Sequence, residues 1–400
     1  MHIARRHTID VSFIISSLFT LFVFVLIVDP PNTLFRLKDV VFAAIFALMC
    51  LSYRDIDRRI FVFLIALYSL ITLSLFRGMA AGYSFDLPFM GYVYKTFVPL
   101  FLLLWMRKLL FFTWRSMVLP GVLVALFTIF VTVVMMLSPE LETIIYNFVK
   151  SKEIMMMGRR SFLGIPITGA YYRSLPVIMI PAAIVFYKAL NERKHRFWTT
   201  LCSLLFLIAM TIAGTRASML AAFIIVGVLV FMKMRRSQAG RMLMIAAAVM
   251  LVPLFVYFVY RLMSETGESS NFTKYGHLES YIDLLRLDPW AFIFGTGPGS
   301  RFFSKGFNMY TEQTEWSYAE FIRMFGIGTT LLLVFFYSFP IYKIYRRRSE
   351  LEYSFAFSLA YFIYLLVAGT NPLLIGSNGT LALICSYNYA YSGNTKGGET

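Results

Sequence analysis

The sequence predicts an all-α integral membrane protein, and three observations lead to this fold class. The chain has 400 residues, of which 59% are hydrophobic and 18% aromatic. Charged residues make up only 14%, well below the roughly 25% of soluble domains. Apolar runs long enough to cross a hydrocarbon core of about 30 Å recur from end to end. Because no stretch is polar enough for a soluble domain, we expect a single polytopic membrane domain over residues 1–400.

The apolar runs divide the chain into about twelve predicted transmembrane helices. The first run follows MHIARRHTID. It is too long for a signal peptide, and no small-residue cleavage site follows it, so we interpret it as a transmembrane helix. The predicted spans are 11–28, 39–53, 60–76, 88–105, 116–137, 174–190, 197–213, 217–232, 242–260, 318–342, 353–369 and 376–391.

Basic clusters on alternate loops predict the orientation. Arg54, Arg58 and Arg59 lie in one such loop, and 346–348 is a run of three arginines in another. Cytoplasmic loops carry the excess of Lys and Arg, so these loops and both termini are predicted to be cytoplasmic. The long loops 138–173 and 261–317 are then predicted to lie on the outer side.

Both long outer loops are predicted to be ordered. Ser138-Pro139-Glu140 is typical of a helix start, and LETIIYNFVKSKEIMMMG places Ile144, Ile145, Phe148 and Met155 on one side. Such a helix lies on the membrane face or packs on the domain, and both interpretations stay open. In the second loop, YGHLESYIDLLRLDPW predicts a helix that ends at Asp288-Pro289.

Cations on the predicted outer side indicate an anion site. The outer loops hold Arg159, Arg160, Arg173 and Lys274. Long loops are translocated despite such charges, so these four residues alone decide little. Lys95, Arg216 and Arg323 lie at or inside apolar segments. A cation near hydrocarbon costs several kcal/mol unless it faces a polar cavity or a partner. Together these residues predict an outward-facing cavity that receives an anion.

The stretch FGTGPGSRFFSKG, residues 294–306, has the alternating glycines of phosphate-binding loops. It lies on the predicted outer side, where no nucleotide is available, and it follows no predicted strand. The open alternatives are a tight turn at a helix boundary and a backbone nest near a non-nucleotide phosphate. In either case we expect the glycines to let the second loop fold over its substrate like a hinge.

Two residues of the second loop are candidates for proton transfer. Glu315 precedes an apolar helical run, where it acts as a general base with a raised pKa or caps the helix. His277 is the one histidine on the predicted outer side, in a structural or a catalytic role. One histidine cannot form a metal site. Cys50, Cys202 and Cys385 lie in apolar runs without ligand spacing. We therefore expect no metal, disulfide or other cofactor.

Several segments resemble the O-antigen polymerase and ligase group. KYGHLESYIDLLRLDPWAFIFGTGPGSRFFSKGF followed by EWSYAEFIRMFGIG is similar to the second periplasmic loop of Wzy-type O-antigen polymerases. GTRAS at 214–218, GAYYRSLP at 169–176 and GTNPLLIGSNG at 369–379 resemble the family's other outer turns. The resemblance implies a GT-C-related fold in the bacterial inner membrane. It also implies a glycosyltransferase that joins repeat units carried on undecaprenyl diphosphate, usually with a separate chain-length regulator as partner. No nucleic acid is involved.

The resemblance and the outer cations together predict residue roles. Arg173 and Arg216 are expected to bind the diphosphate, with support from Arg159, Arg160, Arg323, Lys95 and Lys274. Glu315 is the first candidate for the base and His277 the second. Ligases of the group, which attach finished polymer to lipid A core, usually have a histidine where this chain has Glu315, so glutamate favours a polymerase. A lipid-linked oligosaccharide flippase or other transporter remains an alternative. The lack of an internal repeat and the long outer loops count against it.

Overall fold

The computed structural model describes residues 11–392 except 106–113, 163–164, 214, 236 and 239, and only isolated positions between 243 and 268. Most of the predicted span 242–260 therefore lies outside the described residues. The other eleven predicted spans coincide with helices: α1 (Val11–Val28), α2 (Lys38–Ser52), α3 (Arg58–Ala80), α4 (Leu87–Phe97) continued by the 3₁₀ helix η1 (Val98–Trp105), α5 (Arg115–Leu137), α7 (Leu175–Asn191), α8 (Arg196–Ile212), α9 (Arg216–Met234), α13 (Ser317–Arg346), α14 (Ser354–Gly369) and α15 (Ser377–Tyr391).

The length and apolar composition of the helices indicate a membrane-embedded protein. Among the described residues, six helical segments are long and apolar enough to cross a bilayer: α1, α3, α4 with η1, α5, α9 and α13. Three more, α7, α8 and α14, are apolar but shorter. These lengths and compositions confirm the predicted helical membrane class, while the number of twelve crossings stays a prediction.

The loop 138–173, which is predicted to lie on the outer side, contains one predicted helix and one hairpin that was not predicted. We call it the first outer loop after that prediction. Helix α6 (Pro139–Lys152) starts as expected, because the Ser138 hydroxyl accepts a hydrogen bond from Leu141 N. The placement of Met155 on this helix is wrong. Glu153 adopts a left-handed conformation (φ 53°) that ends the helix, and Met155 begins β1 (155–162), which pairs antiparallel with β2 (165–172). The all-α prediction therefore missed this hairpin.

Helix α6 uses its two faces differently. Val149 is buried and Ile145 packs against the core, so one face lies on the domain, next to α5 and β1. Leu141, Ile144 and Phe148 are exposed on the helix. The packing of α6 on the domain is therefore observed, while contact of its exposed apolar face with a membrane stays a prediction.

The described part of the loop 261–317, called the second outer loop after its predicted side, folds into a small unit of its own. It contains α11 (Ser269–Leu287), α12 (Trp290–Phe294) and the strands β3 (Phe302–Ser304) and β4 (Met309–Thr311). The predicted end of α11 at Asp288-Pro289 is confirmed. Tyr281, Leu284, Ala291 and Phe302 form a buried core between these elements. The loop is therefore a packed structure on top of the helices.

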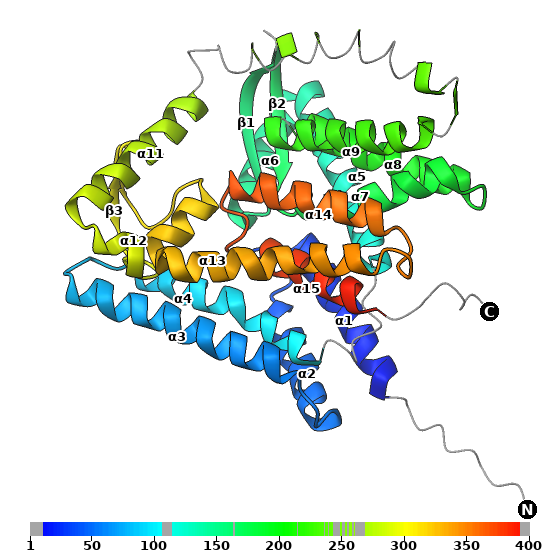
Figure 1. The fold of residues 1–400 in the computed structure, drawn as a ribbon. Helices are drawn as coiled ribbons and strands as arrows, with labels where there is room; N and C mark the ends of the chain where they lie inside the picture. Colours follow the sequence, from blue (N-terminus) through cyan, green and yellow to red (C-terminus); the bar gives the residue numbers. More distant parts are fainter. Residues whose placement is uncertain are drawn as a thin grey trace, which may run out of the picture.

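Figure 1 shows the second predicted outer loop beside the α3–α4 turn, whereas α6 and the β1–β2 hairpin lie elsewhere on the molecule. Helices α3, α4, α13 and α14 run roughly alongside one another. The α3–α4 turn, α11, α12 and β3 lie at one end of them, and the α13–α14 turn lies at the other. Helix α7 packs against α5, α8, α9, α14 and α15, so the core lies around α7 and α15.

Candidate functional site

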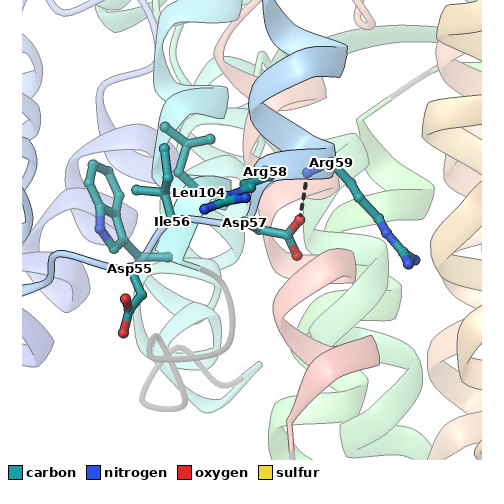
Figure 2. Close-up of a pocket in the computed structure, with 7 residues that line it drawn as sticks. Asp55, Ile56, Asp57, Arg58, Arg59 and Leu104 are labelled. Carbon is teal, nitrogen blue, oxygen red and sulfur yellow. Dashed lines mark hydrogen bonds between the residues drawn. The ribbon is translucent and has the colours of Figure 1, made fainter.

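A pocket of about 470 Å³ lies at the α2–α3 turn (Figure 2). It is lined by Asp55, Ile56, Asp57, Arg58, Arg59, Leu104 and Trp105. The N–H of Asp57 donates to the Leu104 carbonyl at 2.8 Å and joins two of its walls. This pocket is at the start of α3, whereas the other end of α3 approaches the second outer loop, where Gly78 packs on the Thr296 carbonyl. None of the predicted site residues lies in it.

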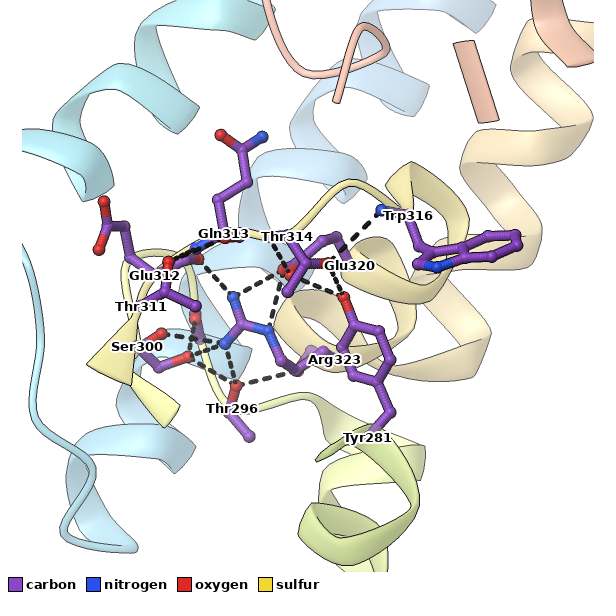
Figure 3. Close-up of polar contacts among 11 residues, drawn as sticks. Tyr281, Thr296, Ser300, Thr311, Glu312, Gln313, Thr314, Trp316, Glu320 and Arg323 are labelled. Carbon is purple, nitrogen blue, oxygen red and sulfur yellow. Dashed lines mark hydrogen bonds and ion pairs between the residues drawn. The ribbon is translucent and has the colours of Figure 1, made fainter. Parts of the chain in front are cut away.

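Arg323, a predicted diphosphate ligand, lies at the centre of a buried network (Figure 3). Its side chain is 1% exposed and that of Glu320 is 0% exposed. Nε and Nη2 donate to Glu320 Oε2 at 2.9 and 2.7 Å. Nη1 donates to the Ser300 hydroxyl and carbonyl, and Nη2 also donates to the Glu312 carbonyl. A guanidinium has five N–H donors, and these contacts occupy all of them. The expectation that Arg323 faces substrate is therefore not supported by its position.

The second oxygen of the Glu320 carboxylate extends this network to α11. Oε1 accepts from the Tyr281 hydroxyl and from Thr314 N, both at 2.8 Å. Burial, and then the charge of Glu320, raise the pKa of Tyr281, so the phenol stays protonated as a donor. The network ties α11 and residues 312–314 to α13.

The glycine turn is part of the same internal structure. Gly295, Gly297 and Gly299 have φ angles of 79°, 89° and 80°. The N–H groups of Thr296 and Gly297 donate to the carbonyls of Arg323 and Met324 at 2.7 and 3.0 Å. A Cβ at Gly297 would lie 2.9 Å from the Leu75 Cα. The tight-turn alternative describes this segment, whereas amides directed at α13 cannot form a phosphate nest. The glycine turn is packed between α3 and α13. This packing does not fit the expectation that the turn is a hinge.

Glu315 stands at the surface immediately before α13. Its side chain is 34% exposed, and its Oε2 lies 3.9 Å from Nζ of Lys274 on α11. Helix α13 starts at Ser317, and no side chain caps its N-terminus, so the capping alternative for Glu315 finds no support. The structure thus brings two predicted site residues together as an accessible carboxylate beside a cation.

His277 is one helical turn from Lys274 but points into the second loop. It is fully buried, its Nδ1 is 2.8 Å from the Ser304 hydroxyl, and its ring meets Phe307 edge-on. Desolvation by burial lowers the pKa of His277, so the imidazole is neutral at neutral pH. These contacts fit the structural role, because the ring fastens α11 to the β3–β4 hairpin.

A second group of cations surrounds the start of α15. Nζ of Lys38 donates to the Ser377 hydroxyl at 3.1 Å. Lys95 pairs with Asp39 at 2.6 Å and is half-exposed. The Arg173 carbonyl accepts from Asn378 Nδ2 at 2.6 Å, and the Arg173 guanidinium is partly exposed, with Nη2 3.7 Å from the Glu153 carboxylate. We call Lys38, Lys95 and Arg173 the basic cluster. Two of its three members were predicted from the sequence.

The sequence interpretation missed Lys38, Tyr92 and Asn378. Lys38 immediately precedes an apolar segment, which is the same signal that singled out Lys95. Asn378 is a polar side chain near the start of a predicted span, and such residues are rare enough in hydrocarbon to signal a site. Tyr92 gave no signal, because tyrosine is common at membrane interfaces.

The turn 370–376 lies between the two groups of charged residues. The Asn371 carbonyl accepts from the Ser317 hydroxyl at 2.5 Å, two residues after Glu315. The Ile375 carbonyl accepts from the Tyr92 hydroxyl at 3.2 Å, and the basic cluster begins at Ser377. The segment GTNPLLIGSNG therefore joins the Lys274–Glu315 pair to the basic cluster.

Three predicted arginines lie elsewhere. Arg216 begins α9 directly after the capping residue Thr215, and α9 packs on α7, α8 and α14. Arg159 and Arg160 lie on β1 opposite Thr168 and Ile167, and their side chains are outside the described structure. Within the described ranges, no group of three or more His, Cys, Asp or Glu residues could hold a metal ion.

Two comparisons with known proteins were negative. No protein-family model matches the chain, and no curated protein sequence matches it. The fold defines a helical membrane protein, and its function has to be argued from the residues of the site.

Proposed function

We propose that this chain is an O-antigen-type polysaccharide polymerase. It would join oligosaccharide repeat units, each carried on undecaprenyl diphosphate, at the periplasmic face of the bacterial inner membrane. The observation that carries the proposal is the pair of charged groups on either side of the turn 370–376. One group is cationic and suits a diphosphate, and the other offers a carboxylate to a sugar hydroxyl. A GT-C-like arrangement with twelve crossings and cytoplasmic termini belongs to the same proposal.

The basic cluster is the proposed diphosphate site. A guanidinium such as that of Arg173 stays charged at any working pH and binds phosphate oxygens bidentately. Lys38 and Lys95 add two further cations around the start of α15. Stabilising the negative charge that builds on a leaving diphosphate is a large catalytic term. Arg216, Arg159 and Arg160 stay proposed as additional contacts.

The proposed reaction is one inverting displacement. A hydroxyl oxygen of the acceptor sugar attacks the anomeric carbon of the donor while the bond from that carbon to the diphosphate oxygen breaks. The diphosphate leaves with the electron pair, and the hydroxyl proton passes to the Glu315 carboxylate. The exposure of Glu315 supports this role better than the burial of His277 does. Lys274, whose Nζ is 3.9 Å from Glu315 Oε2, would hold the carboxylate in position beside the acceptor sugar. The diphosphate ester supplies the driving force, so the proposal needs no nucleotide.

The proposed partners follow from the substrate. The prenyl chain lies in the bilayer while the diphosphate and glycan reach the outer end of the helices. A chain-length regulator is proposed as a further partner, by analogy with the family that the sequence resembles.

The test is polymerisation by purified protein in lipid nanodiscs, supplied with a lipid-linked repeat unit and neither nucleotide nor metal. We expect a ladder of repeats on a sizing gel, and we expect Arg173→Ala to abolish it. Arg286→Ala is the matched control, because Arg286 is exposed on α11 and paired only weakly with Asp283 at 3.8 Å. It should leave the ladder intact.

Absence of a ladder with the cognate lipid would refute the polymerase proposal. The same lipid would then be tested for transfer of its glycan to lipid A core, which identifies a ligase. Movement of the lipid across a liposome bilayer would identify a transporter.

A further inference from the structure

The first turn of α15 combines the basic cluster with two polar atoms that have no partner. Nε of Arg173 and Oδ1 of Asn378 are buried and lack a hydrogen-bond partner among the described residues. Asn378 is 7% exposed. Leaving such a donor and acceptor unmatched is unfavourable. The two residues are already joined, since Asn378 Nδ2 donates to the Arg173 carbonyl at 2.6 Å.

That hydrogen bond fixes which way the Asn378 amide points. Turning the amide over would place Oδ1 against the Arg173 carbonyl at the same short distance, where two acceptors repel each other. Nδ2 is therefore the atom that faces the carbonyl, and Oδ1 is an acceptor that faces elsewhere. Two residues in contact through the Arg173 carbonyl thus offer an unmatched acceptor and an unmatched donor, and this combination suits a ligand that carries a hydroxyl beside an anionic oxygen.

The surroundings favour an anion at this position. The first N–H groups of a helix have no intrahelical partner and carry partial positive charge. Lys38 reaches Ser377 at this end of α15. The Tyr92 hydroxyl lies over the capping residue, since a Cβ at Gly376 would be 2.6 Å from it, and Tyr92 is within electrostatic range of Arg173. Only a glycine leaves room for this hydroxyl.

We infer that Asn378 is a substrate-recognition residue, whose Oδ1 accepts a hydrogen bond from a hydroxyl of the sugar directly attached to the diphosphate. Arg173 Nε then donates to the neighbouring phosphate oxygen, so that one pair of residues recognises the glycosyl–diphosphate junction. This inference rests on the proposed function, because it assigns a part of the same donor site.

The experiment measures binding of two lipids to the full-length protein in nanodiscs: undecaprenyl diphosphate alone, and undecaprenyl diphosphate that carries N-acetylglucosamine. Asn378→Ala should weaken binding of the sugar-bearing lipid by roughly 5- to 10-fold, the size of one hydrogen bond. The same variant should change the dissociation constant of undecaprenyl diphosphate by no more than about twofold, because that lipid has no sugar. Arg173→Ala should weaken both lipids by about tenfold or more.

The control variant is Asn371→Ala, which changes an asparagine of the preceding turn 370–376 whose Nδ2 donates to the Val367 carbonyl instead of to the cluster. This variant should leave the binding of both lipids unchanged. If Asn378→Ala does not fold, Asn378→Ser is the replacement, since its hydroxyl can still donate to the Arg173 carbonyl.

Equal effects of the Asn378 variant on both lipids, or no effect, would overturn the inference and give Asn378 a structural role. Failure of the wild type to bind either lipid would overturn both the inference and the proposed function. Selective binding without any polymer ladder would support the inference while refuting the polymerase, so the two failures are distinguishable.

Discussion

Replacing Glu320 by alanine should detach the second outer loop from α13. The carboxylate accepts two hydrogen bonds from Arg323 on one oxygen and bonds from Tyr281 and Thr314 on the other. In Glu320→Ala, the Arg323 guanidinium stays in a site where it is 1% exposed, but it has lost its counter-charge.

The size of the destabilisation follows from the burial of Arg323 and Glu320. Removing one partner of a buried ion pair costs about 3–5 kcal/mol, because an uncompensated charge remains inside the protein. The Tyr281 hydroxyl and Thr314 N–H also lose their acceptor, and each unmatched group adds about 1–3 kcal/mol unless water enters. We therefore expect a loss of at least about 3 kcal/mol in the free energy of unfolding.

The assay is unfolding of purified variants in detergent, followed by tryptophan fluorescence. Trp316 is a local reporter, because its indole N–H donates to the Lys274 carbonyl at 3.3 Å and so joins α13 to α11. The matched control is Glu350→Ala, which breaks another Arg–Glu pair three residues apart. Arg347 and Glu350 are 2.9 Å apart, but the Glu350 side chain is 49% exposed. This variant should cost about 0–1 kcal/mol.

Equal destabilisation by the Glu320 and Glu350 variants would refute the reasoning. It would mean that water reaches Arg323 as easily as it reaches Arg347. A stable Glu320→Ala variant that binds undecaprenyl diphosphate more tightly would restore Arg323 as a substrate ligand.

Three further predictions concern other positions. Glu315→Gln should slow polymer formation by roughly 100-fold or more without lowering the unfolding temperature, since Glu315 is partly exposed; an unchanged rate would exclude it as the base. Because burial lowers the pKa of His277 below 6.5, the unfolded chain binds the proton more readily, and stability falls as the pH drops below about 6.5. His277→Gln should flatten that dependence in unfolding scans between about pH 7.5 and 5, and parallel wild-type and variant curves would contradict this. Gly297→Ala should destabilise by more than about 1 kcal/mol, because φ is 89° and the Leu75 Cα would be 2.9 Å from the new Cβ; an unchanged unfolding temperature would show that the turn yields.

Helical segments could be predicted well from the sequence, for a simple reason. In hydrocarbon each backbone polar group must be satisfied within its own segment, so a long apolar run is nearly sufficient to specify a helix. The β1–β2 hairpin was missed because its stability depends on pairing between Met155 and Tyr172 and along the rest of the two strands. Such pairing has no equally local signature.

The candidate site could be predicted only in part. Charge in an apolar context drew attention to Lys95 and to Arg323 alike, yet one is half-exposed and the other is enclosed. Composition cannot tell an exposed cation from an enclosed one. Lys95 and Arg323 both have an acidic partner, and a partner is all that a cation near hydrocarbon requires. The partners of Arg323 lie up to 27 positions away in the sequence, and only folding brings them to it.

The sequence by itself determined the helical membrane class and the approximate extent of the described helices, because these follow from local composition. The tertiary structure alone decided which charges are internal and which can meet a substrate. Packing of α15 at the centre brings Lys38 and Arg173 together around Asn378, although 205 positions separate Arg173 from Asn378. The buried Glu320–Arg323 pair, in turn, fixes the loop that presents Glu315. Such long-range contacts depend on how the helices pack, and no single segment encodes them.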